Sequence, residues 1–331
     1  MTQSSLYFTA PCTVEIRDEP RATLPADRLR VQTIVSAISA GTEMLFYRSQ
    51  VPAELSTDAT IEALSGGIAY PLKYGYACVG RVVEAGAQVP DGASWIDRTV
   101  FAFNPHETHF CALPTALIPV PDGIAPEQAA LLPNMETAVN FTIDGQPIIG
   151  ERVAVIGQGI VGLLTTHLLA RFPLAELNAL DRIPQRLAQA QKLGATHRVD
   201  PANESALPRN MDLIYELSGN PAALDTAITL GGFDARVIVG SWYGTKRAEI
   251  DLGGHFHRNR IRIISSQVST IAPATSGRWT KARRLDLAWS MLRQLDTTAL
   301  ITHRISFHQA ADAYTLLDQE PERVIQVILN Y

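Results

Sequence analysis

The sequence is poor in cysteine: Cys12, Cys78 and Cys111 are far apart, and none belongs to a CxxC pair. Neither a disulfide framework nor a zinc knot is therefore expected, and we interpret the three cysteines as small buried hydrophobic residues. The chain also lacks an apolar run near the ~20 residues that span a bilayer. No charged segment followed by an apolar core stands at its start. These absences predict a cytoplasmic protein without a membrane span.

A basic excess is missing as well, since the net charge is −5 and the pI is near 5.9. Binding to nucleic acid needs cationic groups that neutralise phosphates, so we expect a small-molecule substrate instead. The local basic cluster from Arg278 to Arg284 is interpreted as a solvated face. What the sequence does contain is 46% hydrophobic residues over 331 positions, enough to bury large cores in two domains.

The most informative stretch runs from Arg152 to Asp181. It begins with a short apolar, β-branched run, residues 152–156, of the kind that is buried on both faces of a parallel sheet. A GxGxxG turn follows at 157–162, and the pattern then predicts a helix to about residue 170 and a second strand at 177–180. Glycines here permit a tight turn, close approach of a pyrophosphate and close helix packing. The residues that we expect to contact a dinucleotide are Gly157, Gly159, Ile160, Val161 and Gly162.

The residue at the end of the second predicted strand, Asp181, bears on the choice of cofactor. A carboxylate at this place can accept hydrogen bonds from both hydroxyls of an adenosine ribose and would repel a 2′-phosphate, which favours NAD. Arg182 and Arg186 follow it, and their guanidinium groups could hold a 2′-phosphate instead. We therefore expect NAD as the cofactor, with NADP as the alternative.

The order of predicted elements divides the chain. Residues 1 to about 118 contain irregular strands punctuated by proline and glycine, which is typical of a separate, mostly antiparallel domain. From Arg152 strands and helices alternate, and six strands with crossover helices predict a doubly wound parallel sheet. The tail predicts a helix at 285–295 and strands at 303–307 and 324–329, which we assign to the first domain. The predicted fold class is α/β, with a first domain at 1–135, a dinucleotide-binding domain at 136–268 and a return to the first domain at 269–331.

Three motifs add a family resemblance. They are Ser36–Phe46 (SAISAGTEMLF), Tyr70–Tyr76 (YPLKYGY) and Leu300–Arg304 (LITHR). Over nearly its whole length the chain resembles the medium-chain dehydrogenase/reductase superfamily of alcohol dehydrogenase-like proteins. Within it, the chain is most similar to the bacteriochlorophyllide a dehydrogenase-like subgroup, which oxidises a hydroxyethyl side chain on a chlorin ring. The resemblance implies a GroES-like β-rich catalytic domain, a Rossmann domain and an active site in the cleft between them.

The departures from the zinc-containing members of that superfamily are informative. Those members carry a cysteine in the first motif, Gly-His-Glu in the second, and a cysteine or carboxylate after the helix that connects the domains. Here the matching positions are Ala40, the triplet Gly75-Tyr76-Ala77, and Pro133. Alanine, tyrosine and proline cannot build a tetrahedral zinc site. We therefore expect a protein that lacks zinc.

Without a Lewis acid, hydrogen-bond donors must stabilise the substrate oxygen. By resemblance Thr42 matches a hydroxyl used for proton relay, with a turn or cap hydroxyl as the alternative. Tyr76 either donates a proton as general acid or fills the vacated zinc cavity. Glu136 orients substrate, caps an amide or faces water, while Thr137 matches a threonine near the nicotinamide. For Glu43 we favour an internal ion pair with an arginine over catalysis.

Two segments after later strands complete the expected cofactor site. Ser218 and Gly219 match the superfamily loop that passes the adenosine and pyrophosphate. Gly240 and Ser241 follow the next strand, where the carboxyl ends of the sheet form the ligand crevice. The Trp-Tyr pair at 242–243 either walls a pocket for a flat or bulky substrate or packs against the fold.

The predicted function is a zinc-independent NAD(H)-linked oxidoreductase for a secondary alcohol and its ketone, with a bulky or planar substrate in view. One alternative is an NADPH-dependent quinone or enoyl reductase, because zinc-free superfamily members often reduce an activated C=C bond. The other is a non-enzymatic, crystallin-like nucleotide-binding protein. Superfamily members commonly pair through the last strand of the nucleotide domain, so a homodimer through Ile261–Ser265 is expected by analogy.

Overall fold

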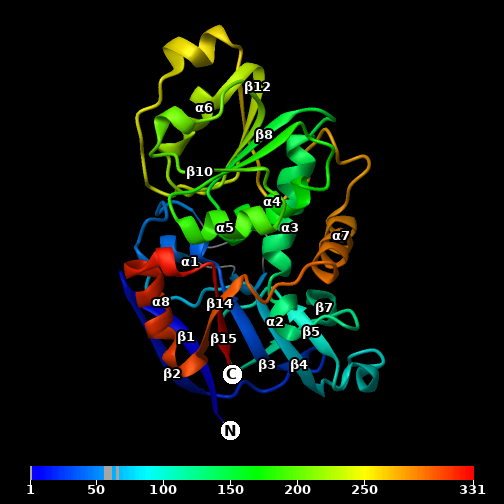
Figure 1. Cartoon of the computed structure of the whole chain (residues 1–331). Helices are drawn as coiled ribbons and strands as arrows, with labels where there is room; N and C mark the ends of the chain where they lie inside the picture. The colour runs from blue at the N-terminus through cyan, green and yellow to red at the C-terminus, as the bar shows by residue number, and fades with distance from the viewer. Residues whose placement is uncertain (1, 56–61, 65–66) are drawn as a thin grey trace. The chain divides into compact units, whose positions relative to one another are not determined.

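The computed structural model describes residues 2–55, 62–64 and 67–331 (Figure 1). Contacts within the chain divide it into unit 1, with Met1–Pro133 and Leu292–Tyr331, and unit 2, with Asn134–Met291. The return to unit 1 therefore lies at Leu292, later than the predicted boundary at 268. Residues up to 291 group with unit 2 because Arg284 is buried there and binds Glu136.

The described residues of unit 1 form two sheets. An antiparallel pair consists of β1 (Thr2–Ala10) and β2 (Thr13–Pro20). The strands of the larger sheet are β3 (Leu29–Ile38), β4 (Cys78–Ala85), β5 (Thr99–Ala102), β6 (His109–Ala112), β7 (Leu117–Pro119), β14 (Ile301–Ser306) and β15 (Gln326–Asn330). Their order is β14-β15-β3-β4-β5-β7, with β6 also paired to β3. Because β15 pairs antiparallel with β3, the end of the chain completes the sheet that its beginning starts.

The helices of unit 1 are α1 (Ala40–Tyr47), α2 (Pro126–Ala129) and α8 (Ala310–Gln319). Helix α1 starts two residues after β3, and its buried Phe46 joins an apolar core with Phe8 on β1 and Tyr314 on α8. A second core lies along β3, β4 and β5. The first core fixes α1, which carries Thr42, against the rest of unit 1.

Only one of the three cysteines is fully buried as predicted. Cys78 lies in the core of unit 1, whereas Cys12 is exposed and Cys111 is half-buried. The prediction is wrong for Cys12 because this residue stands in the tight turn between β1 and β2, with a left-handed φ of 58°. A turn of this kind lies on the surface whatever its side chains are.

Unit 2 contains one parallel six-stranded sheet. Its strands are β8 (Arg152–Ile156), β9 (Glu176–Leu180), β10 (His197–Val199), β11 (Met211–Glu216), β12 (Gly231–Val239) and β13 (Arg262–Ser265). Its helices are α3 (Leu132–Gly145), α4 (Ile160–Leu169), α5 (Pro184–Lys192), α6 (Ala223–Leu230) and α7 (Lys281–Arg293); α3 and α7 extend across the unit boundaries. The order β10-β9-β8-β11-β12-β13 confirms the predicted doubly wound sheet, and its direction of winding reverses between β8 and β11.

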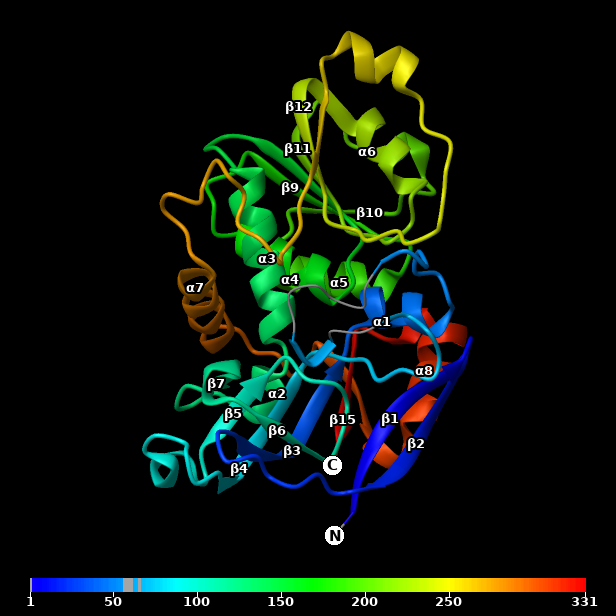
Figure 2. The same ribbon diagram turned by 180° about the vertical axis from the view of Figure 1, so that it is seen from behind.

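Alternating residues of the unit 2 strands enter two different apolar cores. On β8, Ala154 and Ile156 pack with α6, whereas Val153 and Val155 pack with Phe141 of α3 and with the end of α4. The period of two explains why the strand is apolar throughout: both of its faces are covered by helices. Figures 1 and 2 show this twisted sheet with α6 beside β11 and β12.

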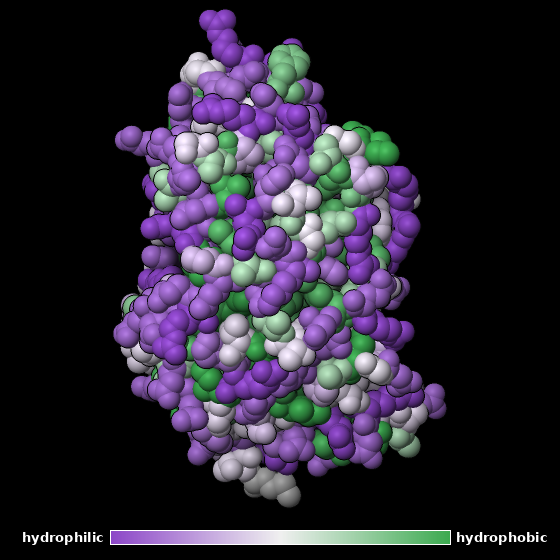
Figure 3. Space-filling model, viewed as in Figure 1, coloured by the Kyte–Doolittle hydropathy of each residue, from purple (hydrophilic) through white to green (hydrophobic). Residues whose placement is uncertain are grey.

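Helices long and apolar enough to cross a membrane do not occur in the part of the chain that the structure describes. On the face shown in Figure 3, hydrophobic residues form small patches between polar ones. Strand β13 pairs with β12 on one side and forms an edge of the six-stranded sheet. Its Ile263 is 38% exposed, so the edge that was predicted to pair two copies is accessible within unit 2.

Candidate cofactor and active site

The glycine turn after β8 is shaped by close contacts at two positions and open space at a third. Gly157 has a φ of +89°, and a Cβ at Gly162 would lie only 1.9 Å from the carbonyl oxygen of Gly157. By contrast, nothing lies within 4 Å of the Cβ position of Gly159, and no described side chain caps α4 there. The first N–H groups of α4, at Ile160 and Val161, therefore offer a favourable place for a pyrophosphate.

Asp181 lies at the carboxyl end of β9 and holds the glycine turn. Its Oδ2 accepts a hydrogen bond from the backbone N–H of Gln158 at 2.6 Å, and its Oδ1 accepts one from Ile183 at 2.9 Å. A carboxylate can accept about four hydrogen bonds, so both oxygens keep capacity for the hydroxyls of a ribose. Arg182 is exposed and Arg186 is half-buried on α5, so both cationic groups lie on the segment that follows the carboxylate.

The loops after β11 and β12 meet beside the glycine turn. A Cβ at Gly157 would lie 2.6 Å from the backbone of Ser218, and the N–H of Gly219 donates to the Ser241 hydroxyl at 2.8 Å. The buried carboxylate of Glu216 accepts hydrogen bonds from the backbone and hydroxyl of Ser218. Lys246 donates to the carbonyl oxygen of Gly219. The three loops at one edge of the sheet are thus held by polar contacts.

The remaining cofactor candidates lie where α3 passes the end of β12. A Cβ at Gly240 would lie 2.3 Å from the ring of Phe141, so the helix and the strand end are in close contact. Thr137 stands one helical turn before Phe141, on the same side of α3. Tyr243 does not form a free aromatic wall, because its hydroxyl donates to Glu216 at 2.5 Å. Burial, and then this carboxylate, raise the pKa of the Tyr243 phenol.

Glu136 is engaged in a buried ion pair within unit 2. Nη2 of Arg284 lies 2.8 Å from its carboxylate, and both side chains are buried. Arg284 also donates to Asn140 at 2.5 Å and to the carbonyl oxygens of Val268 and Thr270. Burial raises the pKa of Glu136, while the neighbouring guanidinium opposes that rise. The carboxylate of Glu136 is thus paired with a cation and neither faces water nor caps a backbone amide. Because Arg284 is buried, the prediction of a solvated face at 278–284 is wrong for this residue.

Three hydroxyl groups come together in unit 1. The Tyr76 phenol donates to the Ser39 hydroxyl, and it lies 3.4 Å from the hydroxyl of Thr42. All three side chains are half-buried, and the ring of Tyr76 packs against the apolar core that includes α1. The ring therefore packs against the apolar core while the hydroxyl joins a polar cluster, and the role of Tyr76 as general acid stays a prediction. The cluster offers a proton donor next to two further hydroxyls.

A buried polar network supports this cluster from behind. Oε1 of Glu43 accepts a hydrogen bond from the backbone N–H of Ser39 at 2.7 Å. Its Oε2 accepts one from the Tyr314 hydroxyl at 2.5 Å and lies 3.0 Å from Nε2 of His106. Nδ1 of His106 lies 2.7 Å from the Ser36 hydroxyl. The predicted arginine partner of Glu43 is therefore wrong: its partners are a histidine, a tyrosine and a backbone amide.

The side chains at the three expected zinc positions are poor metal ligands, and zinc independence stays a prediction. Ala40 begins α1 and has no donor atom, and Tyr76 presents a phenol bonded to Ser39. Pro133 also has no side-chain donor. Among residues 2–55, 62–64 and 67–331, no group of three or more His, Cys, Asp or Glu residues could hold a metal ion. A tetrahedral site needs nitrogen, sulfur or carboxylate ligands that these positions do not supply.

The sequence pattern did not reveal several polar partners in these clusters. Ser39 directly precedes α1 and Glu216 is the last residue of β11, and a polar residue at the end of an element was the available signal for both. His106, Tyr314 and Lys246 had no such signal. The first two are separated from Glu43 by 63 and 271 residues, respectively. Only the folded chain brings them together.

Comparisons with known proteins agree with this architecture. No protein-family model matches the chain. D-guloside 3-dehydrogenase of Escherichia coli K12 is 22% identical over 98% of this chain and 99% of its own length. The starvation-sensing protein RspB of the same strain is 24% identical over 64% of this chain, and that match spans 61% of RspB.

Solved structures match over the whole chain. RspB of Escherichia coli complexed with NADH has a TM-score of 0.78 at 19% identity, covering 100% of this chain and 99% of that one. A proposed zinc-binding dehydrogenase from Sinorhizobium meliloti 1021 bound to NADP has a TM-score of 0.78 at 16% identity, with 100% of both chains covered. The fold is thus that of the alcohol dehydrogenases, with a GroES-like β-rich unit and a Rossmann unit. Together, these dehydrogenase relatives support an NAD(P)-dependent oxidoreductase of the medium-chain dehydrogenase/reductase type, a group that includes zinc-type proteins.

Proposed function

We propose that this protein is a zinc-independent, NAD(H)-linked oxidoreductase that interconverts a secondary alcohol and a ketone. The observation that carries the proposal is the hydroxyl cluster of Ser39, Thr42 and Tyr76, two of whose members stand at or beside positions that hold zinc ligands in zinc-containing relatives. A bound nicotinamide supplies the hydride donor or acceptor. The chain itself has to bind the substrate oxygen and move one proton.

In ketone reduction, Tyr76 donates its phenolic proton to the carbonyl oxygen as negative charge develops there. When the ketone binds, the phenol turns its single proton from the Ser39 hydroxyl to the carbonyl oxygen, and the hydroxyls of Ser39 and Thr42 then donate to the phenolate oxygen that remains. In alcohol oxidation, the proton moves the opposite way. Hydrogen-bond donors placed in advance at a developing oxyanion are a strong source of catalysis.

Binding of the nucleotide is assigned to unit 2. We propose that the glycine turn holds the pyrophosphate and that Asp181 accepts the ribose hydroxyls. Because a carboxylate repels a 2′-phosphate, this assignment favours NAD. The solved relatives contain either NADH or NADP, so the preference depends on this chain's own residues.

The test of cofactor choice is a titration of chelator-treated protein with NADH and NADPH, followed by nicotinamide fluorescence. We expect NADH to bind more tightly, and Asp181→Asn to weaken NADH binding about tenfold by removing a charge-assisted acceptor. Asp200→Asn is the matched control, because Asp200 is an exposed carboxylate after the next strand, β10. Preference for NADPH in the unmodified protein would instead assign the 2′-phosphate to Arg182 or Arg186. The quinone or enoyl reductase alternative would then come first.

The test of the hydroxyl cluster is turnover by Tyr76→Phe. Removing one general acid typically costs about 10²-fold or more, so we expect kcat to fall about 10²-fold while cofactor binding is unchanged. Tyr70→Phe is the control, because its hydroxyl donates to the backbone of Phe46 and not to the cluster. Loss of turnover on zinc removal, with recovery on zinc addition, would overturn the zinc-free proposal. Turnover by Tyr76→Phe at the unmodified rate would exclude Tyr76 as the acid.

The substrate class and the assembly are also proposals. The name of D-guloside 3-dehydrogenase supports a glycoside or polyol as the secondary alcohol. Trp242 lies in the loop after β12 and is 37% exposed, which supports a flat or bulky substrate. A panel with polyols, glycosides, aromatic ketones and hydroxyethyl chlorins distinguishes them. We further propose a homodimer through β13, to be measured by light scattering with the edge substitution Ile263→Lys.

A further inference from the structure

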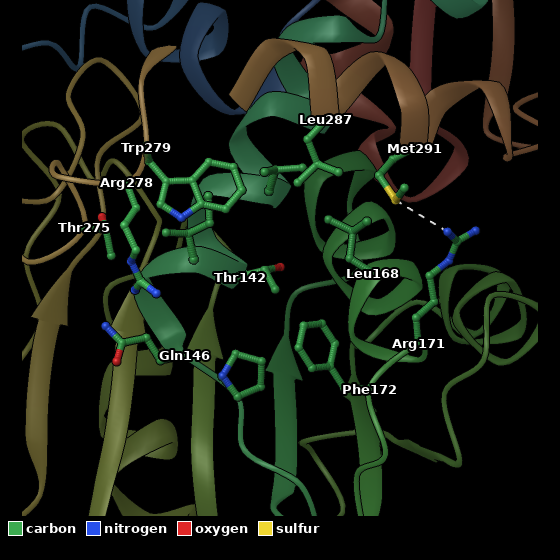
Figure 4. A pocket seen from close by; sticks show the side chains of 13 residues that line it. Thr142, Gln146, Leu168, Arg171, Phe172, Thr275, Arg278, Trp279, Leu287 and Met291 are labelled. Atoms are coloured by element: carbon green, nitrogen blue, oxygen red, sulfur yellow. Dashed lines mark hydrogen bonds between the residues drawn. The ribbon is translucent and has the colours of Figure 1, made fainter. Parts of the chain in front are cut away.

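Unit 2 contains a cavity that the proposed reaction does not use. Its volume is about 360 Å³, within the usual range for small-molecule sites. Figure 4 shows its walls: Leu168 comes from the end of α4, Phe172 from the turn that follows this helix, Thr142 from α3, and Leu287 from α7. All the residues that line it belong to unit 2.

The interior of the cavity suits an apolar body. The Thr142 hydroxyl donates to the carbonyl oxygen of Ala138 in its own helix, and the Thr275 hydroxyl donates to that of Ala272. These hydroxyls are already hydrogen-bonded, so the inner surface is dominated by aliphatic and aromatic carbon. Trp279 forms one side, and the guanidinium of Arg283 stacks 4.3 Å from its ring centroid. A flat ring could pack against the same indole.

Charge at the opening has one sign. Arg171 and Arg278 line the cavity, both are exposed, and no acidic residue is among its lining residues. Figure 4 shows Arg171 beside Met291, whose sulfur accepts a hydrogen bond at 3.4 Å, and Arg278 on the opposite side near Gln146. Guanidinium groups bind carboxylates with paired N–H donors. From this combination we propose a second binding site, for a small aromatic or aliphatic carboxylate.

This site is separate from the loops after β8, β11 and β12, to which we assign the nucleotide. Helix α4 starts at the glycine turn and has ten residues, so it is about 15 Å long. The cavity lies at its other end, beyond Leu168, and beside Gln146, which follows the last residue of α3. A ligand here approaches the amino-terminal side of the sheet, whereas the cofactor loops lie at the carboxyl ends of the strands. The site therefore binds its carboxylate with or without the nucleotide.

The experiment is isothermal titration of the full chain with naphthalene-2-carboxylate, with and without saturating NADH. Naphthalene-2-carboxamide is the matched neutral ligand. We expect the carboxylate to bind at least fivefold more tightly than the carboxamide, with NADH leaving its affinity unchanged. The double variant Arg171→Gln/Arg278→Gln should weaken carboxylate binding about tenfold and leave the carboxamide unchanged. The double variant Arg198→Gln/Arg209→Gln, exposed arginines outside the cavity, is the control.

A second variant tests the cavity itself. Leu287→Trp fills the space from α7 at a half-buried position, and it should abolish binding of both ligands while the melting temperature stays close to that of the unmodified protein. If Leu287→Trp fails to fold, the arginine double variant decides. The proposal is overturned if the unmodified protein binds no carboxylate at millimolar concentration. It is also overturned if NADH displaces the ligand, or if the arginine double variant binds it with unchanged affinity.

Discussion

Two buried glutamates, one in each unit, stand next to a threonine of the proposed site. Glu43 follows Thr42 in unit 1, and Glu136 precedes Thr137 in unit 2. Glu136 is paired with the guanidinium of Arg284, whereas Glu43 is held by Tyr314, His106 and the backbone of Ser39. Both carboxylates are committed to internal partners. The comparison teaches that an acid beside a site residue can anchor its helix instead of reacting.

The two anchors differ in the charge of their partners. A buried carboxylate is stable only when its hydrogen-bonding capacity is filled, and Arg284 fills it with a fixed positive charge. The hydrogen-bonding capacity of Glu43 is filled instead by the Tyr314 hydroxyl, the backbone N–H of Ser39 and the imidazole of His106. We therefore expect one large loss of stability when the charge of Arg284 is removed. Removal of one hydrogen-bond partner of Glu43 should cause a smaller loss, because its other partners remain.

The largest effect is expected for Arg284→Gln. It leaves the Glu136 carboxylate buried without its cation, and it also removes donors from Asn140 and from the carbonyl oxygen of Val268. Breaking a buried pair by removing one partner costs about 3–5 kcal/mol in the free energy of unfolding. Urea denaturation measures this loss, with the exposed neighbour Arg283→Gln as control. Equal losses for the two variants would contradict the role of Arg284.

The stability of Arg284→Gln should also depend on pH, because this variant changes the pKa of Glu136. In Arg284→Gln burial is opposed only by the more weakly acting charge of Lys281, so the pKa of Glu136 rises further above the ordinary glutamate value of 4.5. The folded state then keeps its proton to a higher pH than the unfolded chain, so stability falls as pH rises through this window. The loss relative to the unmodified protein should therefore be smaller near pH 4.5 than at neutral pH, as measured by melting temperature. Arg284→Gln/Glu136→Gln should not show this change.

A smaller effect is expected for Glu43→Gln. The amide keeps the shape of the side chain but loses the charge that accepts hydrogen bonds from Ser39 and Tyr314. Hydrogen bonds to charged groups contribute about 1.5–3 kcal/mol, so we expect a loss of about 2 kcal/mol in urea denaturation. Because Glu43 also holds the backbone of Ser39, turnover should fall as well, with cofactor affinity unchanged. Glu322→Gln, at an exposed position, is the control. An equal loss of stability in this control would contradict the role of the Glu43 hydrogen bonds.

Much of unit 2 was predictable because its signals are local. The run at 152–156, the glycines that follow it and Asp181 lie within one βαβ segment, and the structure gives β8, α4 and β9 in that order. Steric need fixes these residues: a side chain at Gly162 would collide with the carbonyl oxygen of Gly157. Strand β10 was not located from the sequence, because three residues give too short a pattern to distinguish from a loop.

The sequence by itself determined the class of fold, the parallel sheet and the glycine turn, because each depends on neighbours in the chain. Tertiary structure decided which partner each polar side chain has: His106 and Tyr314 for Glu43, Arg284 for Glu136, and Ser39 for Tyr76. It also decided that the segment up to 291 belongs to unit 2. The physical reason is that a buried charge needs a partner but does not specify where in the chain that partner lies. Only packing of distant segments makes the choice.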